Sequence, residues 1–141
     1  MAHAGQIIEG RDGFKLELIE TGAETAGERL VMEASYSGEG PLPPVHHHPS
    51  QTETFDVLEG AMLTVIGDAE RRYEAGESFV VPPGTPHQMA ADGGPAQMRW
   101  TVTPALRTAE FFEQLHGAMV REDWDALGPL IEEHQAEVQF G

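Results

Sequence analysis

Short stretches that alternate apolar and polar residues follow one another through most of the chain. Residues 14–20 alternate clearly, and residues 29–37 are a second candidate strand. Six more such stretches follow, separated by glycine, proline and aspartate, at 54–60, 61–68, 69–76, 77–84, 86–94 and 96–104. Short strands spaced by roughly 8–12 residues are typical of an antiparallel sandwich or barrel. Gly67-Asp68 predicts a tight hairpin turn between two of them, because glycine accepts positive φ.

Beyond Pro104 the apolar residues recur at helical spacing. Thr108 is a suitable N-cap for a helix whose apolar positions are Phe111, Phe112, Leu115 and Met119. Residues 121–140 predict one or two further short helices, with an interruption at Gly128-Pro129. The pattern therefore predicts a single domain over residues 1–141, with a β-barrel at about 6–104 and a helical appendage at about 105–141.

Composition narrows the classes of partner. Eight Lys and Arg against 24 Asp and Glu give a formal charge of 8 − 24 = −16. This field repels phosphate backbones and anionic bilayers, so we expect neither nucleic acid nor a membrane as a partner. The start of the chain lacks the pattern of a secretory signal, and we expect a cytoplasmic protein. Because the chain has no cysteine, any bound metal needs histidine, carboxylate or amide ligands.

The candidate chemistry is concentrated in "VHHHPSQTETF", residues 45–55. Side chains at i and i+2 of a strand share a face, so His46 and His48 should project together while His47 points away. Glu53 can return to the same interior after a turn, and His87 begins a later strand after "VPPGTP". Three imidazoles and one carboxylate then converge, a donor set suited to Mn, Fe, Co, Ni, Cu or Zn.

Other polar and apolar positions have weaker predicted roles. Gln51 shares strand parity with Glu53 and is either a weak additional donor, a substrate hydrogen-bonder or a solvated turn residue. Phe55 and Met89 each lie two residues beyond an expected ligand and are the predicted walls of a substrate pocket. Three histidines without partners in the pattern are expected at the surface: His3, His116 and His134.

These spacings resemble the two sequence motifs of the cupin superfamily. The first motif, Gly-x5-His-x-His-x3–4-Glu-x6-Gly, is matched at Gly40, His46, His48, Glu53 and Gly60. The second, Gly-x5-Pro-x-Gly-x2-His-x3-Asn, is matched at Gly76, Pro82, Gly84 and His87, with Ala91 in the place of the final Asn. The segments "HPSQTETFDVLEG" and "VPPGTPH" resemble those of small single-domain cupins of the quercetin-dioxygenase-like type.

The resemblance implies an all-β double-stranded β-helix, or jelly-roll barrel, with a short C-terminal helical segment. It also implies a ligand set for one divalent transition metal (Fe, Mn, Ni, Cu, Co or Zn): His46, His48, Glu53 and His87. The replacement by Ala91 removes an inward polar group but no ligand. Cupins often pair through sheet edges, so we expect a homodimer.

The expected function is that of a metal-dependent oxidoreductase of the dioxygenase type, acting on a small organic molecule that chelates the metal. Two alternatives remain open: a non-oxidative isomerase or cyclase, and a non-catalytic module that binds metal or ligand. Glu53 could also serve as a general base, a role that a pKa raised by the apolar barrel would suit.

Overall fold

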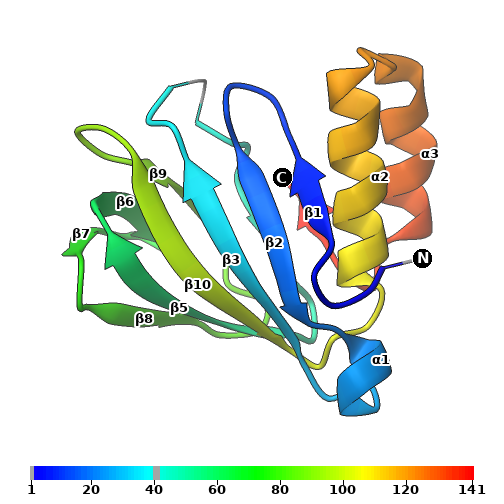
Figure 1. Ribbon diagram of the computed structural model, residues 1–141, viewed down its shortest axis with the longest axis horizontal. Helices are drawn as coiled ribbons and strands as arrows, with labels where there is room; N and C mark the ends of the chain where they lie inside the picture. Colours follow the sequence, from blue (N-terminus) through cyan, green and yellow to red (C-terminus); the bar gives the residue numbers. More distant parts are fainter. Residues whose placement is uncertain (1, 40–41) are drawn as a thin grey trace.

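Two antiparallel sheets face each other in the computed structural model, which describes residues 2–39 and 42–141 (Figure 1). The larger sheet has the order β1-β2-β3-β10-β5-β8 and contains β1 (Ile7–Glu9), β2 (Lys15–Glu20), β3 (Leu30–Tyr36), β5 (Thr52–Glu59), β8 (Ser78–Val81) and β10 (Ala96–Thr103). The smaller sheet has the order β11-β4-β9-β6-β7 and contains β4 (His46–His47), β6 (Ala61–Ile66), β7 (Ala69–Glu74), β9 (His87–Ala91) and β11 (Gln139–Phe140). This arrangement is the predicted all-β jelly-roll barrel. Gly40, the first residue of the first motif, lies outside the described residues.

The predicted strands all form, and two turn glycines show why the chain reverses where it does. Gly67 has φ +61° in the two-residue connection between β6 and β7, as the hairpin prediction requires. Gly60 has φ +71° between β5 and β6, and a Cβ there would lie 2.3 Å from the carbonyl oxygen of Pro95. Any side chain at this position would therefore collide with the backbone of the loop before β10.

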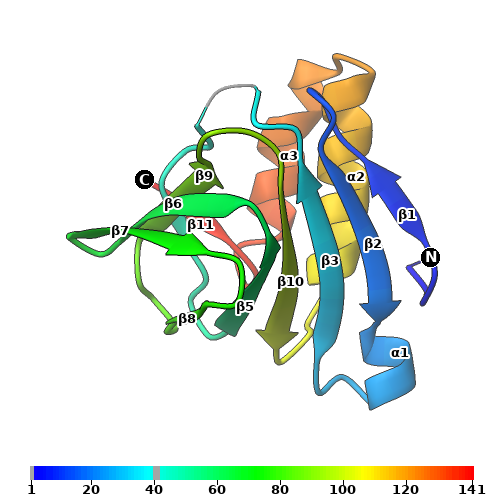
Figure 2. The same ribbon diagram turned by 60° about the vertical axis from the view of Figure 1, so that its left-hand side comes forward.

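The barrel interior is filled by apolar side chains from both sheets. Phe55 is 1% exposed and its ring stacks on those of Phe79 and Trp100, with centroid distances of 4.9 and 5.2 Å. Tyr73 extends the stack from β7 at 4.4 Å from Phe79. Figure 2 shows the two sheets curving around this interior. Alternation along β5, in which every second residue is buried, produces this aromatic layer.

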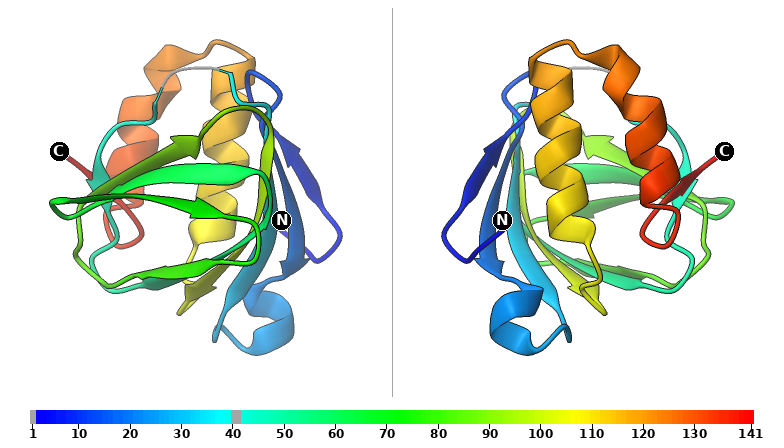
Figure 3. Two further views of the ribbon diagram at one scale, coloured as in Figure 1. Left: turned by 90° about the vertical axis from the view of Figure 1, so that its left-hand side faces the viewer. Right: turned by 90° about the vertical axis from the view of Figure 1, so that its right-hand side faces the viewer.

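Helices close one side of the barrel. The helical elements are α1 (Gly22–Thr25), α2 (Thr108–Val120), the 3-10 turn η1 (Trp124–Ala126) and α3 (Leu127–Glu133). In the right-hand view of Figure 3, α2 lies beside β1 and β2, while α3 lies toward β11. A second apolar cluster fills the space under these helices, with Met32 and Leu18 from the sheet and Phe111 and Leu130 from the helices.

Two details of the helical segment differ from the prediction. Thr108 is the first residue of α2, Arg107 occupies the N-cap, and no side chain caps the helix. The Thr108 hydroxyl instead accepts a hydrogen bond of 2.8 Å from Gln51. Gly128-Pro129 does not interrupt a helix but lies in the first turn of α3, where proline is tolerated because its missing N–H would have no partner.

The chain ends in a strand, which the sequence pattern did not predict. After α3 it returns to the smaller sheet as β11 and pairs with β4. The two-residue strand Gln139–Phe140 is too short to show a period, and it forms because β4 offers a free edge. Among the described residues, no helix combines the length and apolar character needed to cross a bilayer.

Two of the three histidines expected at the surface are largely buried, so that prediction is wrong for them. His134 is 1% exposed and lies 2.7 Å from Glu137, through Nδ1 and Oε1. His116 packs against Phe14 and Phe112, with ring centroids at 4.9 and 6.1 Å, and its Nδ1 is buried without a hydrogen-bond partner in the described part of the chain. His116 lies on α2, and His134 is the residue that follows the end of α3. His3 is exposed, as predicted.

Burial lowers the pKa of His116 to about 4. The unfolded chain takes up a proton on this histidine below its ordinary pKa of about 6.5, whereas the folded protein does not until about pH 4. The free energy of unfolding therefore decreases as pH falls from 6.5 to 4, by up to roughly 3 kcal/mol. We expect His116→Phe to remove this loss, measured as the difference in urea-unfolding free energy between wild type and variant at pH 7 and pH 4.5. Parallel curves for the two proteins would show that His116 does not titrate on unfolding.

Candidate metal centre

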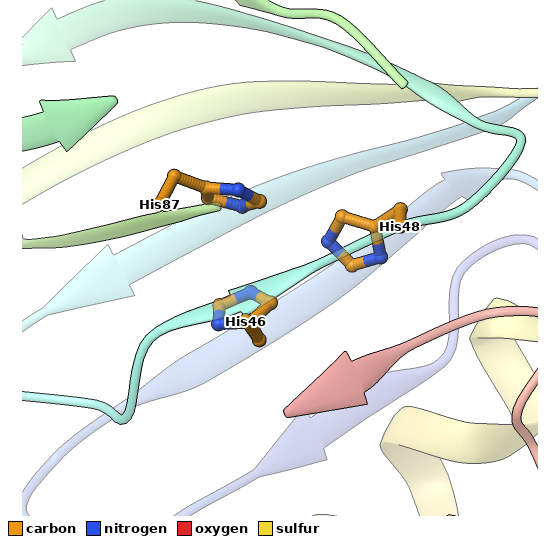
Figure 4. A group of neighbouring side chains, drawn as sticks. All are labelled: His46, His48 and His87. Atoms are coloured by element: carbon orange, nitrogen blue, oxygen red, sulfur yellow. The ribbon is translucent and has the colours of Figure 1, made fainter. Parts of the chain in front are cut away.

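Two neighbouring strands of the smaller sheet bring three imidazoles together. His46 on β4 is the register partner of His87 on β9, and His48 follows β4 directly. One nitrogen from each ring lies within 4.8 Å of those of the other two, so the cluster could hold a metal ion. Figure 4 shows the three rings turned toward a common space. His48 and His87 are buried, at 5% and 2% exposure, and His46 is the more open member.

Backbone carbonyls fix the orientation of each ring. Nδ1 of His46 lies 3.0 Å from the carbonyl oxygen of Pro44, and Nδ1 of His87 lies 2.8 Å from that of Thr85. Nδ1 of His48 lies 2.7 Å from the carbonyl oxygen of Glu137. A carbonyl can only accept, so each Nδ1 carries the proton and each Nε2 presents a lone pair. This is the arrangement by which proteins prepare imidazoles to bind metals.

Glu53 points at the same space from β5 in the opposite sheet. Its Oε1 lies 3.2 Å from Nε2 of His48 and 3.0 Å from Nε2 of His87, and the side chain is 1% exposed. Its Oε2 accepts a hydrogen bond of 2.8 Å from the indole N–H of Trp100. The Trp100 contact fixes the carboxylate so that its other oxygen faces the imidazoles.

The close approach of these atoms requires a positive charge between them. Neither Nε2 of His48 nor Oε1 of Glu53 makes a hydrogen bond of acceptable geometry within the described residues, although they lie 3.2 Å apart. When Nδ1 of a neutral His48 carries the proton, the lone pair of its Nε2 faces a lone pair of the Glu53 carboxylate. Two facing lone pairs at this distance are unfavourable in a buried site. A proton or a metal cation removes the conflict. The donor set therefore fits a divalent metal ion.

The electrostatics of Glu53 differ from the expectation for a general base. Burial acts to raise its pKa, but the adjacent His48 and His87 outweigh burial and lower the pKa of Glu53 to about 2. Burial likewise acts to lower the pKa of His48, and the Glu53 carboxylate outweighs it and raises that pKa. For His46, which is farther from the carboxylate, burial dominates and lowers the pKa to about 4. The expectation of a raised pKa for Glu53 is wrong, because two imidazoles face it.

The other predicted residues lie around this cluster. His47 is outside it, and its Nε2 lies 3.2 Å from Oε1 of Gln139 on β11. Gln51 is fully buried and donates from Nε2 to Thr108 and to the carbonyls of Pro104 and Ala105. These bonds tie the start of α2 to the barrel, and the burial of Gln51 shows that the interpretation as a solvated turn residue is wrong. Oε1 of Gln51 is buried without a hydrogen-bond partner among the described residues, and the role of Gln51 as a metal or substrate contact stays a prediction.

The predicted pocket walls belong to the apolar cluster inside the barrel. Phe55 is 1% exposed and Met89 is 9% exposed, and both contact the same cluster as Met62 and Met98. Their contact with a substrate stays a prediction. Ala91, in the place of the family's Asn, packs against this cluster as well, so the barrel carries an apolar group at that position.

Four contributors to the centre were not identified from the sequence. The hydrogen bond of Trp100 to Glu53 depends on the pairing of β10 with β5, in which Trp100 is the register partner of Phe55. The carbonyls of Thr85 and Pro44 belong to proline-rich loops. The spacing of the ligands does not predict which backbone carbonyl contacts each ring. Glu137 comes from a segment 89 residues away from His48.

Two antiparallel sheets form a barrel, and a histidine cluster lies on β4 and β9 of the smaller sheet. This combination is that of a small jelly-roll barrel with a candidate metal site. The family model described as "Cupin domain" matches residues 32–104, just over half of the chain. The chain therefore belongs to the cupin family, as its two motifs indicated. Cupins often bind a metal, and the three histidines could hold one here.

Relatives and solved structures agree with this membership. The chain is 30% identical over 89 residues to a Bacillus subtilis (strain 168) protein, "Uncharacterized protein YdbB", covering 62% of this chain and 70% of that one. A solved RmlC-like cupin from Shewanella frigidimarina NCIMB 400 is similar with a TM-score of 0.62 and 21% identity, over 74% and 87% of the two chains. The polyketide cyclase RemF from Streptomyces resistomycificus is similar with a TM-score of 0.57 and 21% identity, over 73% and 70%. At these identities the solved structures show the fold alone.

Proposed function

We propose that this cupin binds one divalent transition metal through His46, His48, His87 and Glu53, and that it acts as an oxidoreductase of the dioxygenase type on a small organic molecule. The observation that carries the metal site is the opposition of Glu53 Oε1 to the Nε2 atoms of His48 and His87 at 3.2 and 3.0 Å. A redox-active ion held by three imidazoles and one carboxylate would leave open positions at which O₂ and a chelating substrate are activated.

The surroundings of the centre support a small and largely apolar substrate. The interior beside Glu53 is lined by aromatic and methionine side chains, and the charged groups of the centre are the exception there. An anionic substrate would meet the overall charge of −16 before it reached the site. His46 is the most exposed of the three histidines, and we propose that the substrate approaches from its side.

In this proposal each residue of the centre has a separate task. His48 and His87 would hold the ion through buried imidazoles, and His46 would complete the imidazole set as its most exposed member. Glu53 would balance one positive charge, and Trp100 donates a hydrogen bond to its second oxygen. The low pKa of Glu53 suits a ligand better than a general base.

Metal analysis combined with oxygen uptake tests the function. Protein prepared without a histidine tag should contain or bind about one Fe, Mn, Ni, Cu, Co or Zn ion per chain by mass spectrometry of the elements. With Fe, Mn, Ni or Cu bound, an oxygen electrode should record uptake with at least one member of a panel of flavonols, diketones and small aromatics. His87→Ala should show neither. Bound metal without uptake would favour the isomerase, the cyclase or the non-catalytic module, and no divalent metal would overturn the site.

The remaining proposals concern the setting of the protein. We propose a cytoplasmic homodimer without nucleic-acid or membrane partners, on the basis of its acidic charge and its exposed sheet edges. Light scattering on the purified protein would establish the number of chains per particle.

A further inference from the structure

We propose that the C-terminal residues 134–141 support the metal centre. They position His48 and hold β4 in place, so that metal affinity depends on them. The proposal rests on the metal binding proposed above and assigns positioning roles to Glu137, His134 and β11.

His48 differs from the other two histidines in the source of its carbonyl. His46 and His87 each use the carbonyl two residues before them in the chain, at Pro44 and Thr85. His48 instead uses Glu137, 89 residues later, at 2.7 Å, the shortest of the three contacts. The orientation of His48 is therefore set by tertiary structure, whereas that of its partners is set locally.

The Glu137 carbonyl is itself held from both sides. The Glu137 side chain lies 2.7 Å from Nδ1 of His134, and both residues are buried, at 4% and 1% exposure. The next residue, Val138, is 3% exposed and packs in the cluster under the helices. The backbone N–H groups of Glu137 and Val138 both donate to the His134 carbonyl, at 2.9 and 3.0 Å. A buried acid and histidine at this place serve to fix one backbone carbonyl toward His48.

Strand β11 holds the strand that carries His46. β4 has only two residues, and its pairing with β9 consists of the single pair His46 and His87. On its other edge β11 pairs Gln139 with His47 and Phe140 with His46. The Gly141 N–H donates to the Val45 carbonyl at 3.2 Å. In Figure 4 the arrow of β11 lies next to the strand that carries His46.

The rings add to this pairing. Cross-strand neighbours share a face, and the Phe140 ring lies 5.7 Å from the His46 ring, centroid to centroid. Removing β11 would leave β4 with one paired residue and the ligands without fixed spacing. Outer-shell partners of metal ligands are commonly worth about 10–100-fold in metal affinity. We expect losses of this size here.

Zn²⁺ affinity by competition with a chromogenic chelator tests the proposal. Deleting residues 139–141 should raise the Zn²⁺ dissociation constant by about 10–100-fold. Glu137→Ala should raise it by roughly tenfold, and Glu137→Gln should restore it to within about threefold, because the amide oxygen still accepts from His134. Glu133→Ala is the matched control: it removes a carboxylate from the last residue of α3, just before this segment, where the side chain is exposed and paired with Arg107, and it should leave affinity unchanged.

A nitrogen-15 spectrum of the metal-free protein separates positioning from general loosening. In wild type, the Nδ1–H proton of His48 should exchange slowly with solvent, because the Glu137 carbonyl accepts it. In Glu137→Ala this proton should exchange fast, while those of His46 and His87 stay protected. If the deletion fails to fold by circular dichroism, the full-length pair Glu137→Ala and Glu137→Gln decides. Folded variants that bind Zn²⁺ as tightly as wild type would overturn the proposal. Failure of wild type to bind Zn²⁺ would instead overturn the metal site on which it rests.

Discussion

Replacing His46 with alanine should lower divalent-metal affinity by more than about 100-fold, whereas His47→Ala should lower it by less than about tenfold. The two residues are adjacent on β4, but only the His46 ring belongs to the cluster with His48 and His87. His46→Ala removes one of the three proposed nitrogen ligands. His47→Ala removes a contact of 3.2 Å with Gln139, which supports β4 from outside the cluster.

The measurement is a chelator competition with Zn²⁺ at pH 7.5, with circular dichroism of both metal-free variants as the check of folding. His47→Ala is a close control for His46→Ala, because both variants lose an imidazole from the same short strand. Equal losses would show that both rings face the metal or that β4 is generally weakened. If neither variant loses affinity, the ion binds elsewhere.

Phe55→Ala should reduce the free energy of unfolding by about 3–5 kcal/mol. The Phe55 ring is 1% exposed and stacks on Phe79 and Trp100 in the barrel interior, so truncation removes buried apolar area and leaves a cavity that these rings can fill only in part. The loss would also reach the metal centre, because Trp100 donates to Glu53.

Urea unfolding with EDTA present measures this effect on the metal-free protein, so that any change in metal binding does not contribute. Leu58→Ala is the control on the same strand: its side chain is 40% exposed, and we expect a change within about 0.5 kcal/mol. A loss below about 1 kcal/mol for Phe55→Ala would show that Phe55 borders open space, and its predicted role as a pocket wall would then replace its role in the core.

The strands and the candidate ligands could be predicted because both depend on local spacing. The period of two in residues such as Phe55 and Val57 identifies the inward face of β5, and the same period separates His46 and His48 from His47. Turn glycines mark the hairpins because glycine adopts positive φ without a steric cost, as at Gly67. These signals lie within a few residues of each other in the chain.

The burial of His116 and His134 could not be predicted in the same way. Neither has a ligand-like spacing. His116 on α2 packs against Phe14, and His134, the residue after α3, packs against Phe111. Gln51 shares the parity of Glu53, but its amide is taken up by the start of α2, which only the position of that helix reveals. The sign of the pKa shift at Glu53 also depended on distances to two imidazoles that no spacing supplies.

By itself, the sequence determined the barrel, its hairpins and the set of residues that face a common interior, because alternation and turn chemistry act over a few residues. The tertiary structure decided which contacts orient those residues. It places Glu53 within 3.2 Å of two imidazoles and brings the indole N–H of Trp100 to the second oxygen of Glu53. It also brings the C-terminal segment back to the barrel, where the Glu137 carbonyl orients His48. Such contacts join segments up to 89 residues apart, and their geometry follows from how sheets and helices pack rather than from any local pattern.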